Sequence, residues 1–211
     1  MTLRLNGSTS GYSEIDAPAV AGNNTLLLPG GNGSADQALV TNGSGTLSFA
    51  DRGRMVLETA QSATGTSIDF TGIPSWVKRI TVMLDGVSQS GTSLGIIQLG
   101  DGGGVETSGY LGFASFVSTV ASTNSFTSGF GYMTVGVAAE AFSGMLILAL
   151  EDVSSNTWVM SGTVARSAGG SGVSLASGSK SLSGTLDRVR ITTVNGTDTF
   201  NAGTINLLLE G

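Results

Sequence analysis

Residues 91–95 read Gly-Thr-Ser-Leu-Gly, which matches the G-x-S-x-G pattern of a hydrolase nucleophile. In α/β-hydrolases this pattern lies on a sharp turn between a strand and a helix, and a histidine takes the proton from the serine. Here residues 94–99 continue as a strand-like apolar run, and the sequence contains no histidine. We therefore interpret residues 91–95 as a hairpin turn and expect no serine-hydrolase chemistry.

Acidic residues that fall close together are the next candidates, because a glycosidase needs only two carboxyl groups. The pairs are Glu14 with Asp16, Asp101 with Glu106, and Glu151 with Asp152. Neighbouring strand residues point to opposite faces, so the last pair would not converge on one substrate. Nothing in the sequence brings the other pairs together. We expect solvated loops and strand ends, with no catalytic residue and no enzymatic activity.

The same acidic residues are candidate metal ligands, since calcium needs only oxygen ligands. Asp101 and Glu106 flank the run 100–104, yet their spacing matches no known calcium loop. The glycine run also lacks the G-K-[ST] ending of a phosphate-binding loop. The absence of cysteine and histidine removes the commonest zinc ligands. We expect neither a metal nor a cofactor.

Aromatic side chains gather in one Gly-rich stretch, at Tyr110, Phe113, Phe116, Phe126, Phe130 and Tyr132. Two interpretations stay open. The commoner role for such residues is packing in a hydrophobic core, but aromatic platforms with polar neighbours also bind sugars or cell-surface partners. For the second role, the candidate surface-contact residues are Tyr110, Phe113, Phe130 and Tyr132.

The composition narrows the classes of partner. The 211 residues include 33 glycines, only 11% are charged, and the net charge is -6. An acidic surface repels phosphate backbones, so we expect no nucleic-acid partner. The longest purely apolar run, 145–150, is far shorter than the ~20 residues that span a bilayer. Residues 1–16 lack the apolar stretch of a signal peptide, and we expect no membrane insertion.

Short apolar groups with a two-residue period indicate the elements that would position these side chains. Residues 77–84 place Ile80, Val82 and Leu84 on one side of a strand. Such alternation is typical of half-buried strands, and the apolar run 145–150 predicts a central strand. Further strands are expected at 55–59, 94–99, 110–117, 126–134, 157–164, 186–193 and 204–210.

These strands predict an all-β fold, with a C-terminal antiparallel β-sandwich of jelly-roll-like type. We expect exposed loops in the Gly- and Ser-rich stretches 100–104 and 168–184. Residues 137–142 alone have helical propensity, over too short a length to change the class.

The chain divides near residues 50–54. Residues 1–53 contain few apolar side chains, separated by Asn-Gly and Gly-Gly turn signals. A segment of this kind cannot build a core of its own, so we expect it to be extended and to bury its side chains against other copies. Residues 54–211 form the expected sandwich domain.

Both parts of the chain resemble structural proteins of tailed phages, in particular the modules of cyanophage virions. The matching stretches are 5–12 (LNGSTSGY), 14–18 (EIDAP), 41–49 (TNGSGTLSF), 68–74 (IDFTGIP), 78–82 (KRITV), 182–191 (LSGTLDRVRI) and 195–200 (NGTDTF). The resemblance implies a homotrimer, with the N-terminal part wound about the shared axis and a β-rich C-terminal knob. It supplies no catalytic residue.

The resemblance leads us to expect a virion protein, assembled in the host cytoplasm, that is a tail-fibre-like subunit for host-surface recognition. Its N-terminal segment would attach to other virion proteins or form a shaft, and the sandwich would contact a cell-surface glycan or protein. Two alternatives stay open. One is a capsid decoration (cement) protein that stabilises the phage head. The other is a depolymerase of surface polysaccharide.

Overall fold

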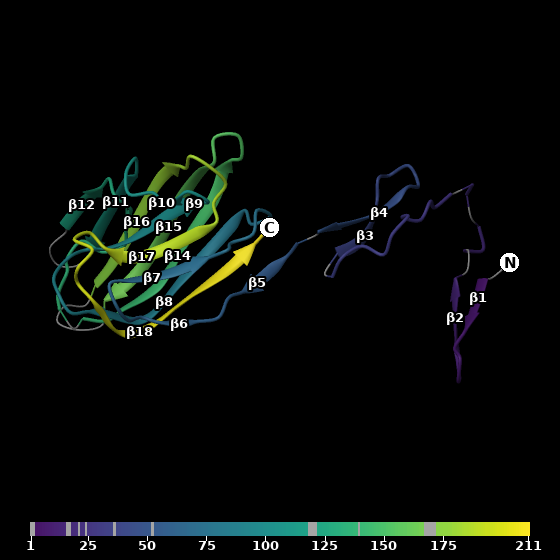
Figure 1. The fold of residues 1–211 in the computed structure, drawn as a ribbon, viewed down its shortest axis with the longest axis horizontal. Coiled ribbons are helices and arrows are strands. Elements are labelled where there is room, and N and C mark those ends of the chain that lie inside the picture. The colour runs from purple at the N-terminus through teal and green to yellow at the C-terminus, as the bar shows by residue number, and fades with distance from the viewer. Residues whose placement is uncertain are drawn as a thin grey trace. The chain divides into compact units, whose positions relative to one another are not determined.

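The computed structural model describes residues 3–15, 18–20, 22–23, 25–35, 37–51, 53–117, 122–138, 140–166 and 172–211. The chain forms two compact units, Met1–Arg52 and Gly53–Gly211. Every regular element among the described residues is a β-strand, and all strand pairs are antiparallel (Figure 1). The predicted all-β class is therefore confirmed.

The larger unit holds two sheets. The five-stranded sheet has the order β10-β9-β17-β7, and β13 also pairs with β9. Its strands are β7 (Ser67–Thr71), β9 (Gly95–Asp101), β10 (Gly104–Val105), β13 (Phe130–Gly131) and β17 (Arg188–Thr193).

The nine-stranded sheet has the order β12-β11-β16-β15-β14-β8-β18-β5, with β6 also paired to β18. Its strands are β5 (Met55–Leu57), β6 (Gln61–Ser62), β8 (Arg79–Gln89), β11 (Leu111–Val117), β12 (Ser122–Phe126), β14 (Phe142–Asp152), β15 (Thr157–Arg166), β16 (Gly172–Ser181) and β18 (Phe200–Glu210). The strand predicted at 145–150 lies within β14, which is central in this sheet.

One buried apolar cluster joins the two sheets. It contains Ile97 and Ile191 from the five-stranded sheet, and Ile80, Leu146 and Leu207 from the nine-stranded sheet. Ile80, Ile191 and Leu207 come from the apolar side of alternating strands, whereas β9, which carries Ile97, is buried at every position. The shared core makes the larger unit a β-sandwich, as the sequence predicts.

The sequence prediction is wrong in two places. Residues 168–184 were expected to be an exposed loop, but 172–181 form β16 between β11 and β15. Residues 126–134 were expected to be one strand, but β12 ends at Phe126 and only Phe130–Gly131 pair again. The described part of 137–142 forms no helix, and β14 begins at Phe142.

The small residues of β16 explain why a loop-like sequence forms a strand. A Cβ atom on Gly178 would lie only 2.5 Å from the backbone oxygen of Leu111, so no larger residue fits there. Ser174 and Ala176, at alternate positions of the strand, are buried. Close approach of neighbouring strands selects small side chains here, and hydropathy gives little sign of this strand.

The smaller unit contains two hairpins without a buried apolar cluster among its described residues. Strand β1 (Leu3–Asn6) pairs with β2 (Tyr12–Ile15), and β3 (Gln37–Thr41) pairs with β4 (Leu47–Asp51). Asn42 closes the second hairpin, because its Oδ1 accepts bonds from the backbone N–H groups of Ser44 and Thr46. The large apolar side chains of this unit are mostly exposed, including Val20 at 93%.

Strand β16 gives a direct test of close packing. We expect Gly178→Ala to lower the free energy of unfolding by about 1–3 kcal/mol, because the added methyl group overpacks the β11–β16 contact. Gly102→Ala is the matched control, since a Cβ atom there meets nothing within 4 Å. Denaturant titration of both variants measures the difference. Equal stabilities would contradict the close-packing explanation.

Candidate surface-contact site

The structure separates the four predicted contact residues. Tyr110, Phe130 and Tyr132 are each 1% exposed or less, whereas Phe113 is 61% exposed. The surface-contact prediction is therefore wrong for the first three, whose rings pack in the core of the sandwich. Phe113 alone is available to a partner.

Tyr110 is held by both packing and hydrogen bonds. Its ring meets Phe130 edge to face, with ring centroids 5.0 Å apart. Its Oη accepts a bond from the backbone N–H of Leu99 at 2.7 Å and donates to the carbonyl oxygen of Glu106 at 3.0 Å. Burial raises the pKa of the Tyr110 hydroxyl above its usual value. Tyr110 is thus a neutral structural residue.

Tyr132 fills the space beside a glycine of β9. A Cβ atom on Gly95 would clash with the Tyr132 ring and hydroxyl, so glycine is required opposite this side chain. Burial raises the pKa of the Tyr132 hydroxyl, which keeps it protonated. This contact joins distant parts of the chain, so the sequence offers only the Gly-rich surroundings of the aromatic residues as a sign of the core interpretation.

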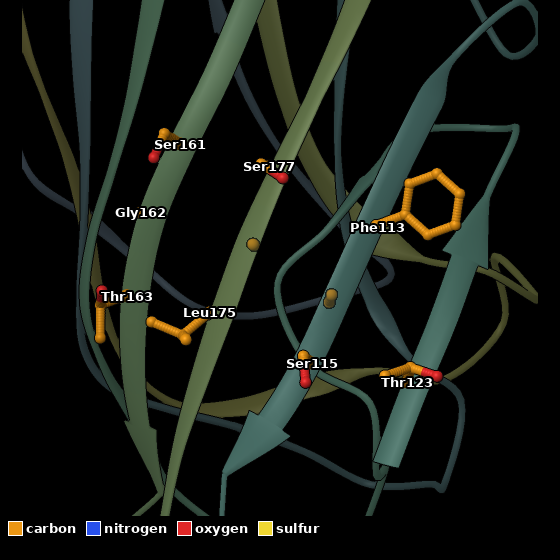
Figure 2. Close-up of a pocket in the computed structure, with 10 residues that line it drawn as sticks. Phe113, Ser115, Thr123, Ser161, Gly162, Thr163, Leu175 and Ser177 are labelled. Atoms are coloured by element: carbon orange, nitrogen blue, oxygen red, sulfur yellow. The ribbon is translucent and has the colours of Figure 1, made fainter. Parts of the chain in front are cut away.

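Phe113 lies on the outward side of β11. The register places it beside Ser125 of β12 and Ser177 of β16. Figure 2 shows its ring on the β12 side of β11, with Leu175 and Thr163 on the other side; these residues line one hollow that extends over β12, β11, β16 and β15. The hollow has a volume of about 370 Å³, and its outward lining includes Phe113, Ser115, Thr123, Ser161, Thr163 and Leu175.

The side chains that line this hollow offer binding contacts and no charged group. None of its ten lining residues is charged, and none titrates near neutral pH. The hydroxyl groups of Ser and Thr offer weak hydrogen bonds, and Phe113 and Leu175 offer apolar surface. The arrangement suits the binding of an uncharged surface and provides no acid–base or nucleophilic pair.

Asp101 and Glu106, which the sequence did not bring together, meet through Ser183. The Ser183 Oγ lies 2.6 Å from Asp101 Oδ2 and 2.9 Å from Glu106 Oε1. Glu106 also forms an ion pair with Lys180, whose side chain is nearly buried. The β9–β10 turn places both carboxylates beside the segment that follows β16, a long-range contact that residue spacing does not reveal.

The charges of this cluster argue against acid catalysis. The hydrogen bond from Ser183 is the main factor that lowers the pKa of Asp101. Burial opposes ionisation of Glu106, but Lys180 and Ser183 outweigh it and lower the pKa of that carboxyl group as well. A glycosidase needs one carboxyl group with a raised pKa. Both groups are ionised at neutral pH and serve to join two loops.

Ser93 of the G-x-S-x-G segment lies in the connection from β8 to β9, as predicted. The backbone N–H of Asn195 donates to Ser93 Oγ at 3.0 Å, and the Ser93 N–H donates to Asp198 Oδ2 at 2.8 Å. These bonds tie the turn to the 194–199 loop. The strand-to-helix elbow of a hydrolase is not formed here, because Leu94 leads directly into β9.

Two further features are absent from the described residues. No group of three or more Asp or Glu side chains gathers as a metal site would require. Within the same residues, no helical segment has the length and apolarity to cross a membrane. Comparison of the chain with protein-family models, curated proteins and solved structures yields no match.

The carboxylate cluster predicts a pH dependence. A lowered pKa in the folded state means that the group stabilises the fold above its unfolded pKa and loses this effect as the pH falls through the folded value. We expect Glu106→Gln to reduce the free energy of unfolding by about 3 kcal/mol at neutral pH, because Lys180 loses its buried partner. The deficit begins to shrink as the pH falls below about 4.5, the usual pKa of the unfolded carboxyl group, and it disappears only below the lowered pKa of the folded state, where wild-type Glu106 is protonated as well.

Urea titrations at several pH values measure this effect. Glu151→Gln is the matched control, because it removes the same charge from an exposed side chain. A pH-independent deficit in Glu106→Gln would show that lost packing, rather than charge, explains the change.

Proposed function

We propose that the protein is a structural subunit of a tailed-phage virion, a homotrimeric tail-fibre-like component that contacts the host surface. The observation that carries this proposal is the contrast between the two units. One unit has a complete apolar core, whereas the other exposes most of its large apolar side chains. The sequence resemblance to phage virion modules supports the same assignment.

The smaller unit needs partners if its large apolar side chains are to be buried, as such side chains are in most folded proteins. Leu3, Leu5 and Ile15 of the first hairpin are 58%, 57% and 66% exposed, and Leu26 and Leu28 are similarly open. A segment of this size cannot gain enough burial from its own few apolar residues. Copies of the same chain around a closed symmetry axis, together with other virion proteins, supply the missing contacts in the proposed assembly.

The sandwich serves as the rigid body of the proposed appendage. Its core is complete, so its loops and outer sheet surfaces are available for recognition without loss of stability. Ion pairs and hydroxyl networks account for the clusters that otherwise invite a catalytic interpretation, including Asp101 with Glu106. This supports a contact protein of the virion in preference to a depolymerase.

The assembly state is the first test. We expect full-length protein to have a mass three times the 21.1 kDa of one chain. Substitution of Leu26, Leu27 and Leu28 by serine removes exposed apolar surface, so the trimer dissociates at a higher protein concentration than wild type. Light scattering over a dilution series measures both. Val153→Ser, an exposed change in the sandwich, is the control.

A full-length monomer at every concentration would contradict the trimer. A trimer whose dissociation is unchanged by the three serine substitutions would contradict the assembly role of the smaller unit.

The position in the virion is tested on particles and cells. For a tail fibre, we expect a low copy number per particle and saturable binding of the purified protein to susceptible cells. Quantitative mass spectrometry of purified virions and a cell-binding titration measure these two quantities. A copy number that matches the capsomers of the head, without cell binding, would favour the cement alternative.

A further inference from the structure

The outward side of five adjacent strands forms a continuous surface, which we name the uncharged face. The strands are β12, β11, β16, β15 and β14, and register fixes which of their residues share this side. One row runs Ser125, Phe113, Ser177, Ser161, Ile147 across all five strands. The large side chains that are exposed on this face are Leu111, Phe113, Val117, Met145, Val159, Val173 and Leu175.

The described outward positions of this face, from 143 to 149 on β14 and on the other four strands, hold only Ser, Thr, Ala and larger apolar residues. Two charged side chains of these strands turn inward, since Lys180 pairs with Glu106 and Arg166 pairs with Glu140 at 2.8 Å. Glu151 and Asp152 lie at the end of β14, where Asp152 is in register with Thr157 at the edge of the face. The middle of the uncharged face is thus left without a charge.

The outer side of the five-stranded sheet has the opposite character. Arg190 and Asp69 form a two-pronged ion pair there, with contacts of 2.6 and 2.8 Å. Arg188 pairs with Asp187, and Thr71 lies exposed beside them. One protein therefore displays a charged sheet surface and an uncharged one, and only the latter shows the depletion of charge that marks an interface core.

The size of the uncharged face is sufficient for association. Five strands spaced ~4.8 Å apart, over about seven residues of ~3.4 Å each, cover roughly 600 Å² before side-chain relief is added. The largest apolar patches on monomers reach about 300–600 Å², and a standard interface buries about 800 Å² from each partner. The face lies in the range expected for a protein contact.

Charge and shape both favour a second copy of this chain as the partner that covers the uncharged face. Chains with a net charge of -6 repel one another, and they approach at least cost where neither presents a charge. The face also carries a protruding ring, Phe113, beside a hollow of about 370 Å³ (Figure 2). A cavity of about 150 Å³ already accepts benzene, so the hollow has room for an aromatic ring from another copy.

We propose that the uncharged face is the surface through which the sandwich units of different copies pack against one another. The inference rests on the proposed homotrimer and adds a second set of contacts to those of the smaller unit. Phe113 and Leu175 are the central apolar contacts, and the surrounding Ser and Thr residues pack closely because their side chains are small. The ion-paired side of the five-stranded sheet faces solvent in the assembly.

Single cysteines provide the test, because the chain contains none of its own. Ser177→Cys places a thiol at the centre of the uncharged face, and Thr71→Cys places the matched control on the outer side of the five-stranded sheet. Both wild-type side chains are exposed in the single chain. We expect a maleimide to label Cys at 177 about ten-fold more slowly than Cys at 71 in native full-length protein, and equally fast in denaturant.

A second substitution separates interface from fold. Adding Phe113→Asp to the Ser177→Cys chain places a charge without a partner in the contact, which weakens the contact between copies. The thiol is then exposed, and we expect its labelling rate to rise to that of the control. Circular dichroism verifies that the β-structure is retained. Slow labelling that persists in a folded Phe113→Asp chain would overturn the central role given to Phe113.

The mass of each labelled sample distinguishes the two proposals. Slow labelling at 177 in a trimer, which speeds up on dilution to monomer, supports the uncharged face as the self-interface. A trimer with fast labelling at 177 overturns this inference and leaves the homotrimer standing. A monomer overturns both, whatever its labelling rate.

Discussion

Burial of apolar side chains between two sheets is the constraint on which the rest of this protein depends. The cluster that includes Ile80, Leu146 and Ile191 takes one side of each strand out of water, and this burial supplies the main driving force for folding. Once the inner sides are committed to the core, the outer sides are free to differ. The five-stranded sheet exposes ion pairs such as Arg190 with Asp69, whereas the uncharged face of the nine-stranded sheet exposes Phe113 among hydroxyl and aliphatic groups.

Polar residues that look reactive in the sequence secure the loops around this core. Glu106 and Lys180 form an ion pair, and Ser183 links Glu106 to a second carboxylate. Near the other loop, Asp198 accepts a bond from the backbone of Ser93. Donors aimed at these carboxylates hold their pKa values low, and a permanently ionised carboxylate is suited to anchoring a loop rather than to donating a proton.

Much of the fold could be predicted from the sequence, because alternation is a local property. The half-buried strands around Ile80 and Ile191 follow directly from the two-residue period. Strand β16 could not be found this way, since Ser, Gly and Ala give little contrast between its two sides. The candidate site was predicted less well. Of the aromatic residues proposed for surface contact, only Phe113 is exposed, and Tyr132 is fully buried.

The sequence by itself determined the all-β class, the division near residues 50–54, the turn at 91–95 and the lack of histidine and cysteine. Each of these follows from composition or from neighbours along the chain. Only the tertiary structure decided which side of β11 faces water, because Phe113 and Phe116 are equally apolar and lie on opposite sides of one strand. It also decided that Ser183 meets Glu106 across 77 residues. Contacts between distant segments depend on sheet order and register, which local periodicity does not specify.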